Sequence, residues 1–249
     1  MTPERTELEW MYQPADFFEA PYRDVNSEYE LLVEGGRAIA TLCVPEDPVN
    51  EELNIRIRTH VENVLLTRQL QVHRGYDLQG PHIRQQTEGG RSVMIQVGAT
   101  AAIAFASQAD FIVRDAAGSI VRDTRAERIA ENTQLLDFIA PKLTQSSELR
   151  EMVTSYSRSI ADPRNELVYL YEIRDGLSKY YGGEQATRAA LNITKTEWQR
   201  LGILANEQPL EQGRHRGKHP AGRRAASNAE LQEARAIVLR WITEFARKI

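Results

Sequence analysis

The chain has 249 residues and a formal net charge of −4, with 41% hydrophobic and 27% charged residues. This composition is typical of a globular protein, and the length allows one large domain or two ordinary ones. No apolar stretch approaches the roughly 18 residues that a membrane span needs, and the charged start MTPERTELEW lacks the apolar core of a secretory signal. The single cysteine, Cys43, excludes an internal disulfide. We therefore expect a cytoplasmic protein with no membrane segment.

The first half of the sequence predicts strands and hairpins. Apolar runs flank Gly35-Gly36 and Gly89-Gly90, and a further pair flanks a turn near residues 116–118. Glycine pairs tolerate the positive φ angles of tight hairpin turns. Between the hairpins, Asn50 is a suitable N-cap for a helix whose apolar residues recur at helical spacing: Leu53, Ile57, Val61, Val64 and Leu65. A strand is expected to follow at residues 70–76.

Isolated polar and aromatic groups in this half are expected to be structural. Cys43 falls in an apolar run and is predicted to be buried and inert. The aromatic segment 10–22 is expected to cover a sheet edge or to pack on the other domain. His60, His73 and His82 lie at no metal-ligand spacing. We therefore expect ordinary structural histidines there.

From residue 123 onward the apolar period changes to that of helices. The pattern predicts a helix at 124–143, and then a helix that begins at Asp162-Pro163 and ends at Gly182-Gly183. Two capping boxes, Thr194 with Glu197 and Ser227 with Glu230, predict two later helix starts. The expected class is α+β: an N-terminal domain of antiparallel hairpins with one or two helices at 1–125, a connecting helix at 124–143 and an all-α helical bundle at 144–249.

The basic stretch at residues 211–227, EQGRHRGKHPAGRRAAS, is the strongest local signal for an anionic partner. It contains two histidines, His215 and His219, and five cations: Arg214, Arg216, Lys218, Arg223 and Arg224. Arginine binds phosphate oxygens through a planar fork of donors, and histidine exchanges a proton near neutral pH. Such a pair suits metal-independent cleavage of RNA, in which a base removes the 2′-OH proton and a cation stabilises the phosphorane.

The spacing Arg214, His215, three residues and His219 resembles the R-φ-x-x-x-H motif of the HEPN superfamily, where φ is Asn, Asp or His. The resemblance covers at most residues 144–249. It implies an up-and-down helical bundle with the motif near the last helix, and a homodimer whose two motifs form one cleft. It also implies a metal-independent endoribonuclease of a toxin–antitoxin, phage-defence or stress system. Arg214 and His219 would then carry catalysis, and His215 would assist.

Other readings of the same residues stay open. The basic stretch also fits a solvated loop with no enzymatic role, or a loop that binds phosphate or nucleic acid without catalysis. Residues 184–206 resemble a helix-turn-helix, whose second helix would place Lys195, Thr196, Gln199 and Arg200 towards DNA. The same residues fit two packed helices with Trp198 and Leu201 in the core, as in a regulator or a structural protein.

Several catalytic classes lose support from the motifs that the sequence lacks. It contains no H-E-x-x-H, no C-x-x-C, no phosphate-binding G-x-x-x-x-G-K-[ST] and no G-x-S-x-G. We therefore expect no metal and no cofactor. The predicted partners are nucleic acid, RNA more than DNA, and a second copy of the chain. Arg216, Lys218, Arg223, Arg224, Lys195 and Arg200 are expected to assist nucleic-acid binding.

Overall fold

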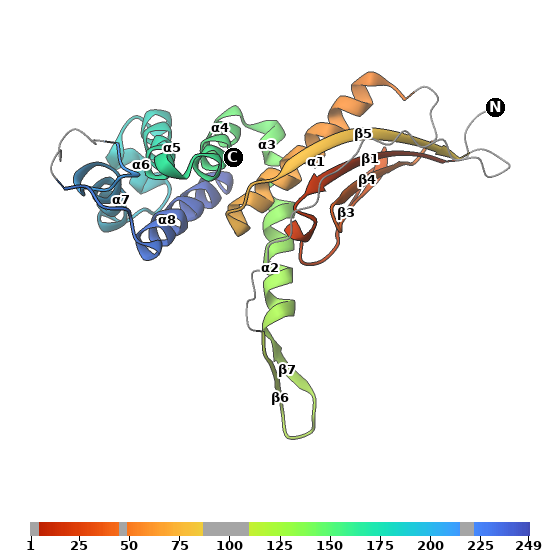
Figure 1. Ribbon diagram of the computed structural model, residues 1–249, viewed down its shortest axis with the longest axis horizontal. Coiled ribbons are helices and arrows are strands. Elements are labelled where there is room, and N and C mark those ends of the chain that lie inside the picture. The colour runs from red at the N-terminus through yellow and green to blue at the C-terminus, as the bar shows by residue number, and fades with distance from the viewer. Residues whose placement is uncertain (1–4, 45–48, 87–109, 215–221) are drawn as a thin grey trace. The chain divides into compact units, whose positions relative to one another are not determined.

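The computed structural model describes residues 5–44, 49–86, 110–214 and 222–249. The chain divides into two compact units. The sheet unit comprises Met1–Arg68 and Tyr76–Phe138, and the helical unit comprises Gln69–Gly75 and Ile139–Ile249. The expected α+β class is confirmed, because an antiparallel sheet comes first in the chain and a helical region follows (Figure 1).

Five described strands form the main sheet, in the order β2-β3-β4-β1-β5, with every neighbouring pair antiparallel. Their bounds are Arg5–Gln13 (β1), Tyr22–Val25 (β2), Tyr29–Glu34 (β3), Arg37–Leu42 (β4) and Asp77–Gln86 (β5), and a single 3-10 turn at Ala15–Phe17 follows β1. The predicted Gly35-Gly36 hairpin is confirmed: these glycines join β3 to β4 with φ angles of 55° and 83°. The second predicted hairpin, at Gly89-Gly90, lies outside the described residues.

The sheet-edge position expected for the aromatic segment 10–22 is wrong for residues 10–13. Residues 5–13 form β1, which lies between β4 and β5 inside the sheet and does not cover its edge. Burial along β1 alternates, since Thr6, Leu8, Trp10 and Tyr12 are fully buried and Glu9 is the one buried residue of the other face. The period-2 pattern of a strand is therefore present, but it begins at Thr6, before the aromatic segment. Cys43 was also predicted wrongly: it is exposed, because β4 ends one residue earlier at Leu42.

Helix α1 (Glu51–Val72) buries the predicted apolar stripe, with Ile57, Val61 and Leu65 fully inaccessible to solvent. The strand expected at residues 70–76 is wrong, since the helix continues through Val72. Leu70 in this last turn is buried, and His73 ends the helix with a left-handed φ of 47°. A buried apolar residue at position 70 is compatible with a helix and with a strand. A short apolar run therefore does not discriminate between the two.

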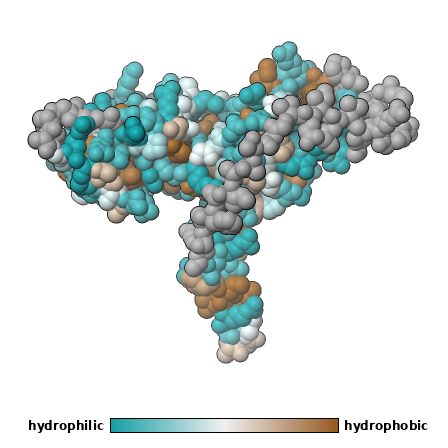
Figure 2. Space-filling view, in the orientation of Figure 1, coloured by the Kyte–Doolittle hydropathy of each residue, from teal (hydrophilic) through white to brown (hydrophobic). Residues whose placement is uncertain are grey.

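A hairpin of β6 (Ile112–Arg114) and β7 (Ile120–Asp123) leads directly into α2 (Thr124–Ile139) (Figure 1). Its predicted turn is confirmed, with Gly118 at a φ of 83°. Figure 2 shows apolar surface on this hairpin, formed by five exposed side chains: Phe111, Ile112, Val113, Ile120 and Val121. Asp123 accepts hydrogen bonds from the amides of Arg125 and Ala126, so the end of β7 caps α2.

The helical unit packs α4 (Ser147–Ala161), α5 (Glu166–Tyr181) and α8 (Asn228–Ala246) against one another. Shorter elements complete it: α3 (Lys142–Gln145), a 3-10 turn at Pro163–Asn165, α6 (Glu184–Ala190), α7 (Lys195–Gly202) and a π-helical turn at Ile203–Glu207. Within this unit, Trp198 from α7 stacks on Trp241 from α8, with ring centroids 5.3 Å apart. The core therefore joins the short helices to the long ones.

Most helix ends were predicted correctly from local signals in the sequence. Both capping boxes are present, at Thr194 and at Ser227, and Gly182 ends α5 with a left-handed φ of 81°. The start of α5 was predicted wrongly. Asp162 and Pro163 begin a 3-10 turn, and α5 starts at Glu166.

Candidate functional site

Arg214, the first residue of the predicted motif, is anchored through its backbone. Its amide donates to the carbonyl of Ala205 at 2.7 Å, and the amide of Gly213 donates to Leu210 at 3.1 Å. A Cβ at Gly213 would lie 2.9 Å from the Ala205 oxygen, closer than carbon approaches oxygen without a shift. The glycine therefore allows the chain to lie against the π-helical turn. This contact sets the backbone position of Arg214.

The side chain of Arg214 is held by one face of α5. Its Nη1 donates to Oδ2 of Asp175 at 2.9 Å, and its guanidinium carbon lies 4.5 Å from the ring centroid of Tyr171. The Arg214 side chain is 35% exposed and that of Asp175 is 53% exposed. Arginine has five N–H donors, and within the described chain only the one on Nη1 has a partner. The other donors have no partner among the described residues and could hydrogen-bond to a phosphate.

Behind Tyr171, a second arginine continues the same arrangement into the core. The guanidinium carbon of Arg174 lies 4.8 Å from the Tyr171 centroid and 4.5 Å from the Trp198 ring, and its Nη1 donates to the Tyr171 hydroxyl at 3.1 Å. We call the resulting series the guanidinium–aromatic stack; its members are Arg214, Tyr171, Arg174, Trp198 and Trp241. The stack joins an exposed cation to the two buried tryptophans.

Four residues of the predicted motif region, His215, Arg216, Lys218 and His219, lie outside the described residues. Arg223 is exposed. Arg224 forms two hydrogen bonds with Glu230, at 2.7 and 2.6 Å, at the start of α8. These hydrogen bonds are the main cause that lowers the pKa of Glu230 to about 2. A hydrogen bond from the Ser227 amide is the next largest cause. The charge of Arg224 is therefore balanced by Glu230.

The helix-turn-helix candidate corresponds to α6, a turn at 191–194 and α7. Asn192 takes a left-handed φ of 51° in the turn, which asparagine tolerates. Lys195 and Gln199 are exposed on α7, whereas Arg200 is bound by both oxygens of Glu233 at 2.9 and 2.7 Å. The inward face carries Trp198, as in a packed helix pair. Lys195 is therefore the cation of α7 that lacks a described ion-pair partner.

Replacing Thr194 with alanine is expected to lower the free energy of unfolding of the helical unit by about 1 kcal/mol. The Thr194 hydroxyl accepts from the Glu197 amide at 3.1 Å, and the Glu197 carboxylate accepts from the Thr194 amide. Chemical denaturation measures the loss. Thr196→Ala is the matched control, because Thr196 is exposed in the first turn and caps nothing. Equal losses in the two variants would contradict the capping role.

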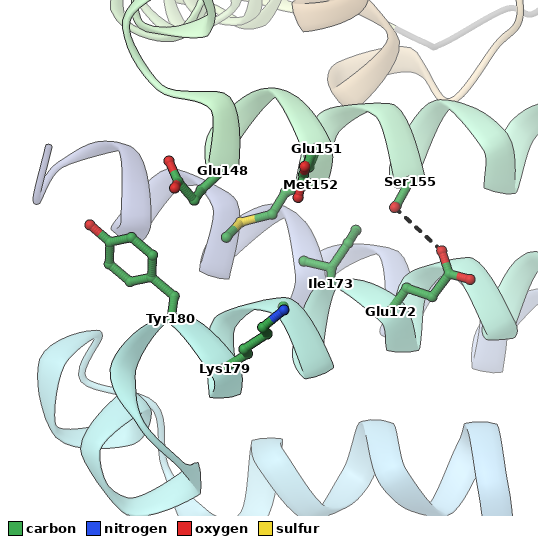
Figure 3. A pocket seen from close by; sticks show the side chains of 9 residues that line it. Glu148, Glu151, Met152, Ser155, Glu172, Ile173, Lys179 and Tyr180 are labelled. Atoms are coloured by element: carbon green, nitrogen blue, oxygen red, sulfur yellow. Dashed lines mark hydrogen bonds between the residues drawn. The ribbon is translucent and has the colours of Figure 1, made fainter.

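A separate groove of about 370 Å³ lies between α4 and α5 (Figure 3). Met152 and Ile173 provide its apolar part, and three carboxylates line it: Glu148, Glu151 and Glu172. Ser155 donates to Glu172 at 3.4 Å across the groove. These α5 residues lie on a different side of the helix from Tyr171, Arg174 and Asp175, given 100° per residue. With three carboxylates and Lys179, the lining carries a net negative charge, which disfavours a phosphate ligand in this groove.

Two of the three histidines in the described regions, His60 and His73, take part in half-buried hydrogen bonds. His60 Nδ1 lies 2.8 Å from the Tyr29 hydroxyl, and burial lowers the pKa of His60. His73 Nδ1 lies 3.2 Å from the hydroxyl of Tyr156. Within the described ranges, no group of three or more His, Cys, Asp or Glu residues is placed to hold a metal ion.

The partners of Arg214 were missed at the level of sequence. Tyr171, Arg174 and Asp175 were not singled out as candidate site residues. They lie 39 residues or more before Arg214 in the chain, so no local motif connects them. The available signal is the i, i+4 spacing of Tyr171 and Asp175, which places an aromatic ring and a carboxylate on one helix face.

Among the described residues, no helix combines the length and the apolar character of a membrane span.

Comparison with known proteins adds no assignment. No protein-family model matches the chain, and searches of curated proteins and of solved structures likewise give no match.

Proposed function

We propose that the protein is a metal-independent endoribonuclease that acts in the cytoplasm, with Arg214 as its phosphate-binding cation. The main observation in its favour is that Arg214 is held at two points. Its backbone amide binds the Ala205 carbonyl, and its side chain contacts Asp175 and Tyr171. A catalytic cation must be held still, since reorganisation during the reaction reduces electrostatic stabilisation. The R-H-x-x-x-H spacing adds two proton-transfer groups next to it in the chain.

In the proposed reaction, His219 accepts the proton of a ribose 2′-OH, with His215 assisting. The 2′-oxygen attacks the adjacent phosphorus, the bond from phosphorus to the 5′-oxygen breaks, and the leaving oxygen takes up a proton. Arg214 donates hydrogen bonds to the phosphorane oxygens and stabilises their charge. The products carry a 2′,3′-cyclic phosphate and a 5′-hydroxyl, so no water is consumed.

The proposal includes a homodimer in which two copies of the motif face one cleft. Mixing an Arg214→Ala chain with a His219→Ala chain provides a test of the shared cleft. If one site draws its groups from both copies, the mixture regains part of the activity that each variant lacks alone. A mixture as inactive as its components, with a dimer shown by mass measurement, would contradict the shared site.

The central experiment is a cleavage assay on RNA in the presence of EDTA. The parent chain is expected to cleave, and the Arg214→Ala, His219→Ala double variant is expected to lose cleavage because both the charge stabilisation and the proton transfer are removed. Arg247→Ala is the control, since it removes one exposed charge at the end of α8. Circular dichroism shows whether the variants are folded. Cleavage that survives the double change, or a parent chain that never cleaves RNA, would refute the proposal.

A second candidate is non-catalytic binding of duplex DNA through α7. The observation that favours it is the exposure of Lys195 and Gln199 on the helix that follows the four-residue turn. A mobility-shift assay with duplex DNA tests it. Lys195→Ala combined with Gln199→Ala should abolish sequence-specific retardation, whereas a parent chain that retards no duplex would exclude this candidate.

A further inference from the structure

We propose that Arg174 is a second phosphate-binding residue, so that Arg174 and Arg214 together bind successive phosphates of one single-stranded RNA. This inference rests on the proposed ribonuclease function and extends its site along α5. Both guanidinium carbons lie within 5 Å of the centroid of the Tyr171 ring, at 4.8 and 4.5 Å. The two cations therefore share one aromatic ring, and a nucleic-acid backbone that follows the edge of this ring would come close to both.

The charge balance around Arg174 differs from that of three other half-buried arginines in the helical unit. Each of the three has a carboxylate partner within 3 Å: Arg200 with Glu233, Arg235 with Glu166 and Arg240 with Glu197. Arg174 has no carboxylate partner among the described residues, and the neighbouring Asp175 already binds Arg214. The stack thus carries two cations and one described anion. A partly desolvated cation without a counter-ion is unfavourable, and a bound phosphate would supply one.

Gly202 at the end of α7 leaves the space that the Arg174 guanidinium occupies. A Cβ at Gly202 would lie 2.6 Å from Nη1 of Arg174. The backbone does not require glycine here, since φ is −60° and ψ is −45°, as in any α-helix. Glycine inside a helix is less favourable than alanine. The feature that glycine supplies at this position is therefore room for the guanidinium between Tyr171 and Trp198.

These facts give two substitutions that remove or displace one cation by different routes. Arg174→Ala removes the charge. Gly202→Ala keeps the charge, strengthens the helix and forces the guanidinium away from its place over Tyr171. A purely structural role for Arg174 predicts that the two variants differ in thermal stability but bind RNA alike. A phosphate-binding role predicts that both bind RNA more weakly.

The experiment measures binding of fluorescein-labelled polyuridine to the full chain by fluorescence anisotropy, over a range of salt concentrations. Every protein tested also carries His219→Ala, which prevents cleavage of the RNA. Arg174→Ala is expected to weaken binding about tenfold and to lower the slope of log K against log [salt] by about 0.7, the value for one phosphate contact on a single strand. Gly202→Ala should weaken binding at an unchanged or raised Tm. Arg158→Ala, which removes an exposed arginine on α4, should change neither affinity nor slope.

Each outcome either supports or overturns the inference. Affinity and slope in Arg174→Ala equal to those in Arg158→Ala would overturn the role of Arg174, even if the parent chain cleaves RNA as proposed. A lower slope together with a parent chain that fails to cleave would refute the ribonuclease and leave Arg174 as a binding residue. If Arg174→Ala does not fold, Gly202→Ala decides, and unchanged binding by that variant overturns the inference.

Discussion

Replacing Arg235 with alanine is expected to lower the free energy of unfolding of the helical unit by about 3–5 kcal/mol. Glu166 is 2% exposed, and Arg235 binds both of its carboxylate oxygens, at 2.6 and 2.9 Å. The substitution leaves a buried carboxylate whose remaining ion-pair partner among the described residues is His73, at 3.6 Å. An unpaired buried charge costs far more than the net stabilisation of the pair it came from. Denaturant unfolding followed by tryptophan fluorescence measures the loss.

Two further variants separate this cost from general damage. Arg247→Ala removes an exposed partner of Glu244 and is expected to cost less than about 1 kcal/mol. The double variant Arg235→Met, Glu166→Leu removes both charges and should recover most of the lost stability. A loss in Arg235→Ala as small as that in Arg247→Ala would show that the Glu166 carboxylate is not left uncompensated.

Stability of the helical unit is expected to decrease by about 3 kcal/mol as the pH falls from 6.5 to 4. Burial, and then the charge of Arg235, lower the pKa of His73 to about 4 from an ordinary value of 6.5. Between these values the unfolded chain binds a proton that the folded chain does not, so acid favours unfolding. The contribution of neutral His73 is fully present above pH 6.5 and is lost progressively below it.

His73→Asn isolates this contribution, because asparagine tolerates the left-handed φ of 47° at this position. Burial also lowers the pKa of His60, so the parent chain loses stability in acid from more than one histidine. The informative quantity is therefore the difference between the two chains in denaturant unfolding at each pH. The variant should lose less stability than the parent between pH 6.5 and 4. Parallel curves over that range would contradict the role of His73.

Features that depend on a few neighbouring residues were predictable from the sequence. The capping boxes at Thr194 and Ser227 and the glycine pair at Gly35-Gly36 each satisfy backbone groups within one turn, so their residue types are restricted locally. The boundary at Val72 was not predictable in this way. The last turn of α1 holds the buried Leu70, whose carbonyl accepts a hydrogen bond from Tyr156, 86 residues later in the chain.

The candidate site shows the same division between local and distant information. The motif identifies Arg214 because its residue type and spacing are visible in one short stretch. Its support is not visible, since Asp175 and Tyr171 reach it only after α5 has packed in the helical unit. Glycine at 202 is likewise unremarkable in the sequence. The reason for a glycine at this position is the guanidinium of Arg174, because its Nη1 lies 2.6 Å from where a Cβ would be.

The division of the chain into units has a consequence for the order of synthesis. Residues 69–75 belong to the helical unit, but residues 76–138 of the other unit follow them before the rest of the helical unit is made. The Leu70 carbonyl and His73 meet their partner Tyr156 only later, and the ion pair of Glu166 forms only after Arg235 has been added. At 5–20 residues per second, the interval from His73 to Arg235 is on the order of ten seconds. The last turn of α1 therefore leaves the ribosome long before the network that it completes can form.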